Sequence, residues 1–230
     1  MALILSLETS TPVCSVALHQ NGVLLGVKEI DQPGAHSEQL IGLIEDLLKD
    51  SNLETSQLGA IAVSEGPGSY TGLRIGVSTA KGLAFAFGIP LLGVSTLAAQ
   101  ARGVGAELEN DAVIVSMLDA RRMEVYREIF DKDQNSIKFL EAEEINELSY
   151  SEFLDRGKVY FIGDAVDKVR EIISNKNAVF IEKSISAVEV GEIAWLKYQK
   201  SEFEDLAYFT PNYLKEFKVL KSKKNPLLLS

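Results

Sequence analysis

Residues 59–87 read GAIAVSEGPGSYTGLRIGVSTAKGLAFAF, and this stretch determines how the chain is expected to fold. Its start, residues 59–64, is short and apolar, as in a buried strand. A glycine-rich turn follows over 65–72, and the remainder up to Phe87 is expected to be helical. A strand that passes through a turn into a helix is a building unit of sheets covered by helices. The stretch therefore predicts an α/β fold.

The residues before this stretch predict a meander of strands. Asn21-Gly22 is a hairpin signal between two strand-like runs. After Pro33-Gly34 a helix is expected from Ser37 to about Asp50, and residues 89–94 are expected to form a further strand. The strands expected before the helix are residues 2–8, 13–19 and 23–29. This order predicts a mixed sheet with helices packed against it, not a Rossmann alternation from the first residue.

The second half of the chain has a weaker pattern. Strands are expected at 112–118, 124–130 and 159–162, and helices at 164–174 and 187–199. Residues 131–146 are polar and predict a protruding loop or a strand pair. Because Gly103-Val104-Gly105 is a candidate boundary, we expect an N-terminal lobe over 1–103, a smaller C-terminal lobe over 104–214 and a lysine-rich tail over 215–230.

Composition narrows the class of protein. The 230 residues include 23 Lys+Arg and 33 Asp+Glu, a net charge of -10, which argues against a surface that wraps nucleic acid. Cys14 is the single cysteine, which excludes a disulfide framework and a cysteine zinc site. The apolar start ends at Glu8, too early for a signal or anchor segment, so we expect a cytoplasmic protein without a membrane segment. Lysines gather only at the end, at Lys215, Lys218, Lys221, Lys223 and Lys224.

Two predicted helices are more apolar than packing on one sheet requires. The apolar arc of the helix over 37–50 covers about 160°, against roughly 100° for one buried face. The helix that ends at Phe87 is apolar almost all round, apart from a polar strip at Arg74, Ser78 and Lys81. We interpret the two helices as a surface for a partner protein. A helix over 37–50 that is wedged between the sheet and a second domain would show the same apolar arc. As partner contacts we predict His36, Leu40, Leu43, Ile44, Leu47, Gly72, Leu73, Gly76, Val77, Ala80 and Ala84.

Small residues recur at every fourth position along the second of these helices. Gly72, Gly76, Ala80 and Ala84 form a ridge that allows another backbone to approach closely. Each helical glycine weakens the helix by about 0.5–1 kcal/mol relative to alanine. We therefore expect a segment to be packed against this ridge.

Two turns could carry chemistry. The turn from Gly66 to Gly72 opens a helix, where free backbone N–H groups bind phosphate, but it lacks the Walker and three-glycine spacings. The other interpretation is a structural turn capped by Ser69 or Thr71. Glu8-Thr9-Ser10 closes the first strand, so Glu8 could orient a metal ion or a water molecule.

Other candidate sites are weaker. The two histidines, His19 and His36, have no His or Cys at ligand spacing, and we interpret His36 as a helix-terminus or interface residue. Asp119-Ala120-Arg121-Arg122 could bind an anionic ligand, and an ion-paired turn between two strands explains it equally well.

Several of these motifs resemble one known family. The quoted turn with its helix, together with Ile4–Ser10, Ile89-Pro90-Leu91 and Asp119-Ala120-Arg121, is similar to the TsaB (YeaZ-like) family. The resemblance covers most of residues 1–126. It implies an actin/Hsp70/sugar-kinase-like fold of two related lobes, the second one degenerate. It also implies a role in making N6-threonylcarbamoyladenosine at position 37 of tRNAs that read ANN codons.

Comparison with the related catalytic family, TsaD, implies a loss of chemistry. Two TsaD histidines that hold the active-site metal correspond here to Thr96 and Gln100, and a hydroxyl and an amide bind transition metals weakly. The TsaD acidic pair after the first turn corresponds to Thr11–Cys14. The nucleotide-loop positions are interpreted as vestigial; they are Glu8, Thr9, Ser10, Gly66, Gly68 and Ser69.

The resemblance also implies partners. We predict a non-catalytic subunit without a cofactor, which pairs with a TsaD-like enzyme or with itself, recruits the ATPase TsaE through the TsaD pair, and meets tRNA within the complex. Pro211–Lys215 resembles a family Pro-x-Tyr-Leu-Arg ending, with Lys in place of Arg. The alternatives are a small-molecule kinase or ATPase of the same fold and a glycoprotease, which would require a nucleophile or a bound metal that the sequence does not show.

Overall fold

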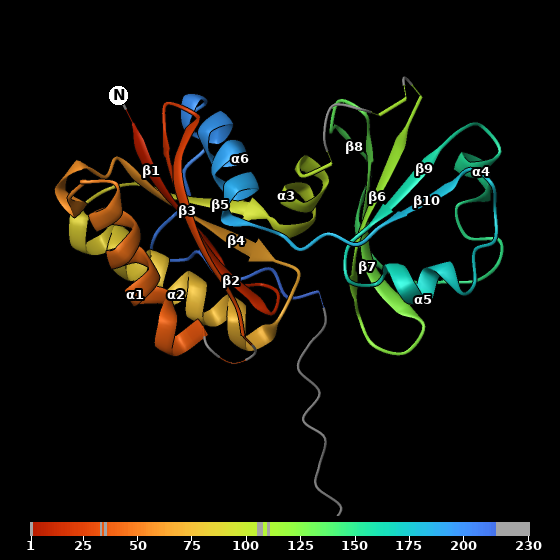
Figure 1. Ribbon diagram of the computed structural model, residues 1–230, viewed down its shortest axis with the longest axis horizontal. Helices are drawn as coiled ribbons and strands as arrows, with labels where there is room; N and C mark the ends of the chain where they lie inside the picture. Colours follow the sequence, from red (N-terminus) through yellow and green to blue (C-terminus); the bar gives the residue numbers. More distant parts are fainter. Residues whose placement is uncertain (1, 33, 35, 105–107, 110, 215–230) are drawn as a thin grey trace, which may run out of the picture.

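The structure is a computed structural model, and it describes residues 2–32, 34, 36–104, 108–109 and 111–214. The described chain forms two five-stranded mixed sheets that lie side by side, each with its own helices (Figure 1). The predicted lysine-rich tail over 215–230, with Lys215, lies outside the described residues. Within the described ranges, no helix has both the length and the apolar character needed to cross a membrane.

The first sheet has the strand order β3-β2-β1-β4-β5. Its strands are β1 (Leu3–Glu8), β2 (Val13–Gln20), β3 (Val23–Asp31), β4 (Ala60–Gly66) and β5 (Leu91–Ser95). The first three strands form the predicted antiparallel meander, whereas β4 pairs with β1, and β5 with β4, in parallel. Asn21 and Gly22 both have positive φ, at 52° and 83°, which explains the tight β2–β3 turn at this position.

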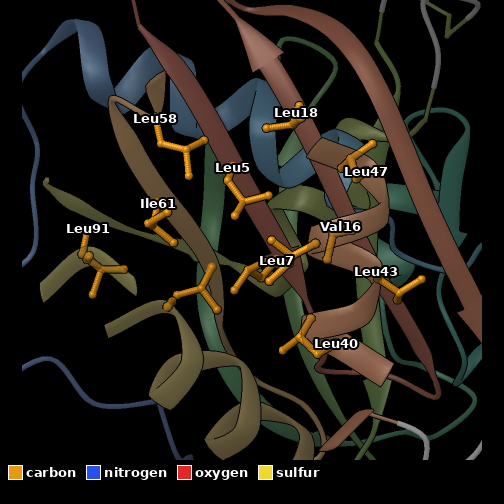
Figure 2. Packing of buried hydrophobic residues seen from close by; sticks show 14 of the residues in the cluster. Leu5, Leu7, Val16, Leu18, Leu40, Leu43, Leu47, Leu58, Ile61 and Leu91 are labelled. Carbon is orange, nitrogen blue, oxygen red and sulfur yellow. The ribbon is translucent and has the colours of Figure 1, made fainter. Parts of the chain in front are cut away.

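One face of this sheet is covered by α1 (His36–Asp50) and α2 (Tyr70–Phe87). Successive side chains of a strand point to opposite faces, so Leu3, Leu5 and Leu7 all point toward these helices. Figure 2 shows Leu40, Leu43 and Leu47 of α1 meeting residues of β1 and β2 in this apolar core. The short 3₁₀ helix η1 (Thr55–Gln57) leads from α1 into β4.

The opposite face is covered by α6 (Ala187–Gln199), with α3 (Thr96–Arg102) beside it. Val190 and Ala194 of α6 are buried in one cluster with Ile4 of β1. The sequence prediction assigned residues 104–214 to the second lobe, and α6 corrects it. This helix packs on the first sheet because its apolar side chains meet small residues there, such as Ala60 and Ala62.

The second sheet has the order β10-β9-β6-β7-β8. Its elements are β6 (Val113–Asp119), β7 (Glu124–Asp131), β8 (Ser136–Glu144), α4 (Ser151–Leu154), β9 (Val159–Ile162), α5 (Val166–Arg170) and β10 (Ala178–Ile181). Both sheets consist of an antiparallel meander followed by two parallel strands, with a helix before each parallel strand. The second lobe therefore repeats the topology of the first with shorter helices, and the expected α/β architecture of two related lobes is confirmed.

Most differences from the prediction concern short elements of the second half. Residues 136–144 form β8, which pairs with β7, so the strand pair is the correct alternative for 131–146. The helix expected at 164–174 spans only Val166–Arg170. Neither α3 nor β10 was predicted. The strand β10 has four residues, all of them apolar and half-buried.

Candidate functional site

The turn after β1 contains the carboxylate that was considered as a metal or water ligand. Glu8 is fully buried at the end of β1. Its Oε1 accepts hydrogen bonds from both the backbone N–H and the hydroxyl of Ser10, at 2.5 Å each. Its Oε2 accepts one from the hydroxyl of Ser64 on β4. Both oxygens are thus used to hold the β1–β2 turn against the neighbouring strand.

Burial sets the protonation behaviour of Glu8. Removal of the carboxylate from water disfavours its charged form, and this raises the pKa of Glu8 above its usual value. The hydrogen bonds from Ser10 and Ser64 act in the opposite direction, and the negative charge of Glu189 adds to the increase. The carboxyl group of Glu8 therefore has a structural role inside the fold, and burial disfavours its ionised form.

The glycine-rich turn after β4 is closed by the same β1–β2 turn. Ser69 is the N-cap of α2, and its hydroxyl accepts a 3.2 Å hydrogen bond from the N–H of Gly72. The N–H of Ser69 donates to the carbonyl of Ser10 at 2.7 Å. Of the two sequence interpretations, the structure supports the structural turn capped by Ser69. Two of the backbone donors of this turn, the N–H groups of Ser69 and Gly72, are therefore occupied by the chain itself.

The ridge of small residues on α2 is packed against Thr9. A side chain at Gly72 would collide with the carbonyl oxygen of Thr9, and one at Gly76 would collide with its hydroxyl. The hydroxyl of Thr9 donates a 2.8 Å hydrogen bond to the carbonyl of Gly72. The expected close approach of a backbone exists, and the segment that makes it is the chain's own β1–β2 turn.

The positions that correspond to metal ligands lie inside the fold. Thr96 begins α3, and its hydroxyl is buried without a hydrogen-bond partner among the described residues. The Oε1 of Gln100 accepts a 2.7 Å hydrogen bond from the hydroxyl of Ser116 on β6. A side chain at Gly163 would collide with the amide of Gln100, so this amide fills the space between the lobes. Among the described residues, no group of three or more His, Cys, Asp or Glu is arranged to hold a metal ion.

The predicted partner contacts require a correction. All of them are buried within this chain; they are His36, Leu40, Leu43, Ile44 and Leu47 of α1 and Gly72, Leu73, Gly76, Val77, Ala80 and Ala84 of α2. The apolar arc is wide because α1 contacts both the sheet and α2 of the same lobe, whereas the alternative expected from the sequence was a position between the sheet and a second domain. His36 starts α1 as expected, and its Nε2 donates a 2.9 Å hydrogen bond to the carbonyl of Thr11.

Other residues of the same helices face solvent. On α1, Ile41 is 48% exposed and Gly42 is exposed next to it. On α2, Phe85 is 79% exposed and Gly82 lies one turn before it. A Cβ atom added at Gly42 or Gly82 would meet nothing within 4 Å. Each helix thus has an exposed apolar side chain near an open glycine, and these four residues, Ile41, Gly42, Gly82 and Phe85, are here called the helix face.

The polar strip of α2 binds the last described segment, a contact that the sequence prediction missed. The Nζ of Lys81 donates to the carbonyl of Phe209 at 2.8 Å, and the guanidinium of Arg74 donates to the hydroxyl of Tyr213 at 3.3 Å. The N–H of Asn212 donates to the carbonyl of Glu65 at 2.7 Å. The available signal was the pair of cations on an otherwise apolar helix. This segment therefore packs along the polar strip of α2 and is hydrogen-bonded to the end of β4.

The sequence of the chain is similar to those of known proteins. The chain matches the family model of TsaD, described as tRNA N6-adenosine threonylcarbamoyltransferase, over residues 31–229. It is 38% identical over 135 residues to the tRNA threonylcarbamoyladenosine biosynthesis protein TsaB of Escherichia coli K12, which is 58% of this chain and 57% of that protein. The TsaB of Bacillus subtilis 168 is 35% identical over 130 residues, 55% of this chain and 54% of that protein. The matches thus span little more than half the length of these relatives.

A solved structure extends the similarity to nearly the whole chain. YeaZ from Pseudomonas aeruginosa superposes with a TM-score of 0.82 at 27% identity. The superposition covers 93% of this chain and all of that chain. The similarity in three dimensions therefore includes the second lobe, beyond the stretch where the curated sequences match.

Proposed function

The chain belongs to the TsaD family, and on this premise we propose that it supports N6-threonylcarbamoyladenosine synthesis on tRNA as a non-catalytic subunit. Its partner in this proposal is a TsaD-like enzyme, which carries out the transfer. The TsaB relatives are named for this biosynthesis, and the sequence motifs of this chain resemble the same proteins. The chain contributes a binding surface, and the enzyme contributes the chemistry.

The observation that carries the proposal is the closure of the glycine-rich turn by Thr9 and Ser10. A site for a phosphate needs unoccupied N–H groups and space for the anion. In this chain the N–H of Ser69 binds the carbonyl of Ser10, and Gly72 lies against Thr9. The carboxylate of Glu8 makes three hydrogen bonds within the chain. These contacts support a structural role for the turn and argue against a kinase or ATPase that uses it.

The residues at the metal-ligand positions support the same conclusion. Gln100 is 2% exposed and is bound to Ser116, while Thr96 is fully buried. An amide and a hydroxyl are weak ligands for transition metals in comparison with imidazole. Packing of Gln100 against Gly163, together with its bond to Ser116, supports a role for Gln100 in joining the two lobes.

The helix face is the surface proposed for the enzyme. Exposed Ile41 and Phe85 can enter the core of an interface, and open glycines at positions 42 and 82 allow a partner helix to approach closely. A stable specific complex would bury about 1,600 Å² in total. When the enzyme is scarce, the same apolar surface can pair with a second copy of this chain. In this proposal the assembled pair of chain and enzyme recruits TsaE and contacts tRNA.

A mass measurement tests the proposed assembly. Light scattering of the chain mixed with a TsaD-like enzyme is expected to give the mass of a heterodimer. The variants Phe85→Asp and Gly82→Arg on the helix face should abolish that species. Phe139→Asp is the matched control, because Phe139 is 80% exposed on β8 of the other sheet and the change adds the same charge. Heterodimers formed by Phe85→Asp as readily as by the control would refute the proposed surface.

A further inference from the structure

The turn between β6 and β7 has an unusual backbone for its sequence. Arg121 and Arg122 have φ of 71° and 53°, so two consecutive non-glycine residues lie in the left-handed region. This region disfavours residues with a Cβ atom, and glycine or asparagine usually occupies it. Both arginines are exposed, and Met123 beside them is also exposed. The turn therefore presents two cations in a strained conformation.

Contacts below the turn hold this conformation. The carboxylate of Asp119 accepts the N–H of Arg121 at 2.7 Å and the Nζ of Lys168 at 2.6 Å. Lys168 also donates to the carbonyls of Arg122 and Glu124, at 3.1 and 2.6 Å. The N–H of Asp119 is in turn bound to the carboxylate of Asp164 at 2.8 Å. The turn is thus fixed by α5 and by the start of the segment that follows β9.

The two guanidinium groups are not used for this support. Within the described ranges, neither the guanidinium of Arg121 nor that of Arg122 makes a hydrogen bond or an ion pair. Arg102 and Arg127, by contrast, are paired with Glu192 and Glu143. The backbone of the turn is bound, whereas both guanidinium groups belong to exposed residues, and the charge of Arg121 acts on the carboxylate of Asp119 without an ion pair between these two described residues.

Strain at an over-determined turn is a feature of binding and catalytic sites, because a sequence chosen for stability alone would avoid it. From the strain and the free guanidinium groups together, we propose that Arg121 and Arg122 bind phosphate groups of an RNA backbone. The proposal rests on the proposed function for the identity of that RNA as tRNA. The planar fork of arginine matches phosphate geometry with two parallel hydrogen bonds.

The charge distribution favours RNA at this place. The chain has a net charge of -10, so most of its surface repels a polyanion. A projecting turn with two adjacent cations offers a local contact that does not require a basic face. The carboxylates near the turn, Asp119 and Asp164, are bound by Lys168 and by a backbone N–H. The two arginines are exposed and form no hydrogen bond through their guanidinium groups among the described residues, although the charge of Arg121 also acts on Asp119.

The test uses variants that suit the backbone and remove the charges. In Arg121→Gly/Arg122→Asn both residues tolerate the left-handed region, so Tm is expected to rise by about 2–4 °C or more. The full chain, alone and with a TsaD-like enzyme, is titrated with an unmodified tRNA transcript that reads an ANN codon. The variant is expected to bind this RNA on the order of tenfold more weakly. The slope of log affinity against log salt should fall by about two.

A control removes two exposed charges elsewhere. Arg156→Gln/Lys176→Gln changes exposed residues that precede β9 and β10. These strands run parallel to β6, and the β6–β7 turn follows the end of β6. The substituted positions therefore lie at the opposite end of the strands from the turn. This control should leave the salt slope unchanged. An equal loss of RNA affinity in the control would show a general charge effect and overturn the proposal. Unchanged RNA binding by the turn variant would also overturn it.

Further measurements distinguish RNA binding from binding of other ligands. They also distinguish failure of this proposal from failure of the proposed function. Loss of enzyme binding with full RNA binding in the turn variant would assign the arginines to carboxylates of a protein and refute the RNA contact. Binding of ATP in place of tRNA, with the same dependence on the arginines, would assign them to nucleotide phosphate and refute it too. Should the chain fail to bind the enzyme, RNA binding by the chain alone still tests the turn, because that titration needs no partner.

Discussion

The hydroxyl of Thr9 donates a 2.8 Å hydrogen bond to the carbonyl oxygen of Gly72, across 63 positions of sequence. This bond joins the β1–β2 turn to the first turn of α2. Together with the bond from the N–H of Ser69 to the carbonyl of Ser10, it fills the region where related sheet proteins bind ligands at strand ends. The turn that most resembles a nucleotide site is therefore a packing contact.

Replacement of helical glycines should have opposite effects at two positions of α2. Gly76→Ala places a methyl group against the hydroxyl of Thr9, and we expect a loss of about 1–3 kcal/mol in the free energy of unfolding. Gly82→Ala is the control, because a Cβ atom there meets nothing within 4 Å. Its higher helix propensity should stabilise the chain by about 0.5–1 kcal/mol. Urea denaturation measures both values, and equal effects would contradict the packing described.

The buried carboxyl group of Glu8 should make stability depend on pH. Its pKa is raised in the folded chain, so the folded state binds a proton more tightly than the unfolded state. The stabilisation from this proton is complete below the ordinary pKa of Glu and is lost as pH rises through the folded value. In Glu8→Gln that loss should be absent, because the amide keeps an acceptor for Ser10 and does not titrate.

The measurement for Glu8 is the free energy of unfolding of both proteins between pH 4.5 and 8. The difference between Glu8→Gln and the parent should shift in favour of the variant as pH rises. A difference that is constant with pH would show that the carboxyl group titrates normally. The same two proteins also test the kinase or ATPase alternative, since phosphate release that depends on Glu8 would support it.

Cys14 should be inert in the folded protein. Burial on β2 raises the pKa of its thiol to about 11, and the charge of Glu8 contributes to this increase. Because the thiolate is the reactive form, an aromatic disulfide reagent at pH 8 should label the unfolded chain at least about a hundredfold faster. Rapid labelling under native conditions would show that β2 opens readily.

Substitutions on the two sides of α1 should separate folding from binding. Leu47 is 2% exposed within the core, so Leu47→Asp should destabilise the chain by about 3–5 kcal/mol through an unpaired buried charge. Ile41→Asp on the helix face should change stability by less than about 0.5 kcal/mol. Thermal denaturation compares them, and a similar Tm for both would contradict the packing of α1.

The first half of the fold could be predicted because its signals are local. Continuous apolar runs predict β1, β2 and β4 to within about two residues, and Asn21-Gly22 predicts the hairpin between β2 and β3. Ser69 could be identified as a cap from its place before a helical pattern. The seven residues of α3 are too few for a periodic pattern, whereas β10, an apolar run as short as the predicted β9, is missing from the prediction.

The candidate site could be predicted only in part. The spacing of Gly72 and Gly76 indicates a close approach, but the residue that approaches is Thr9, and no local pattern connects it to α2. The hydrophobic arc of α1 indicates burial without indicating which segment covers it. For this reason the prediction assigned to a partner residues that the chain's own sheet and helices cover. The exposed side chains beside them form the surface we propose.

The most direct test of the account is the rate of N6-threonylcarbamoyladenosine formation by a TsaD-like enzyme with TsaC, TsaE, ATP, threonine, bicarbonate and tRNA. This rate is measured while the chain is titrated as the parent, as Phe85→Asp or as Phe139→Asp. The account predicts that modification requires the chain, saturates near one chain per enzyme, persists with Phe139→Asp and is lost with Phe85→Asp. Full modification without the chain, or equal support from Phe85→Asp, would contradict it.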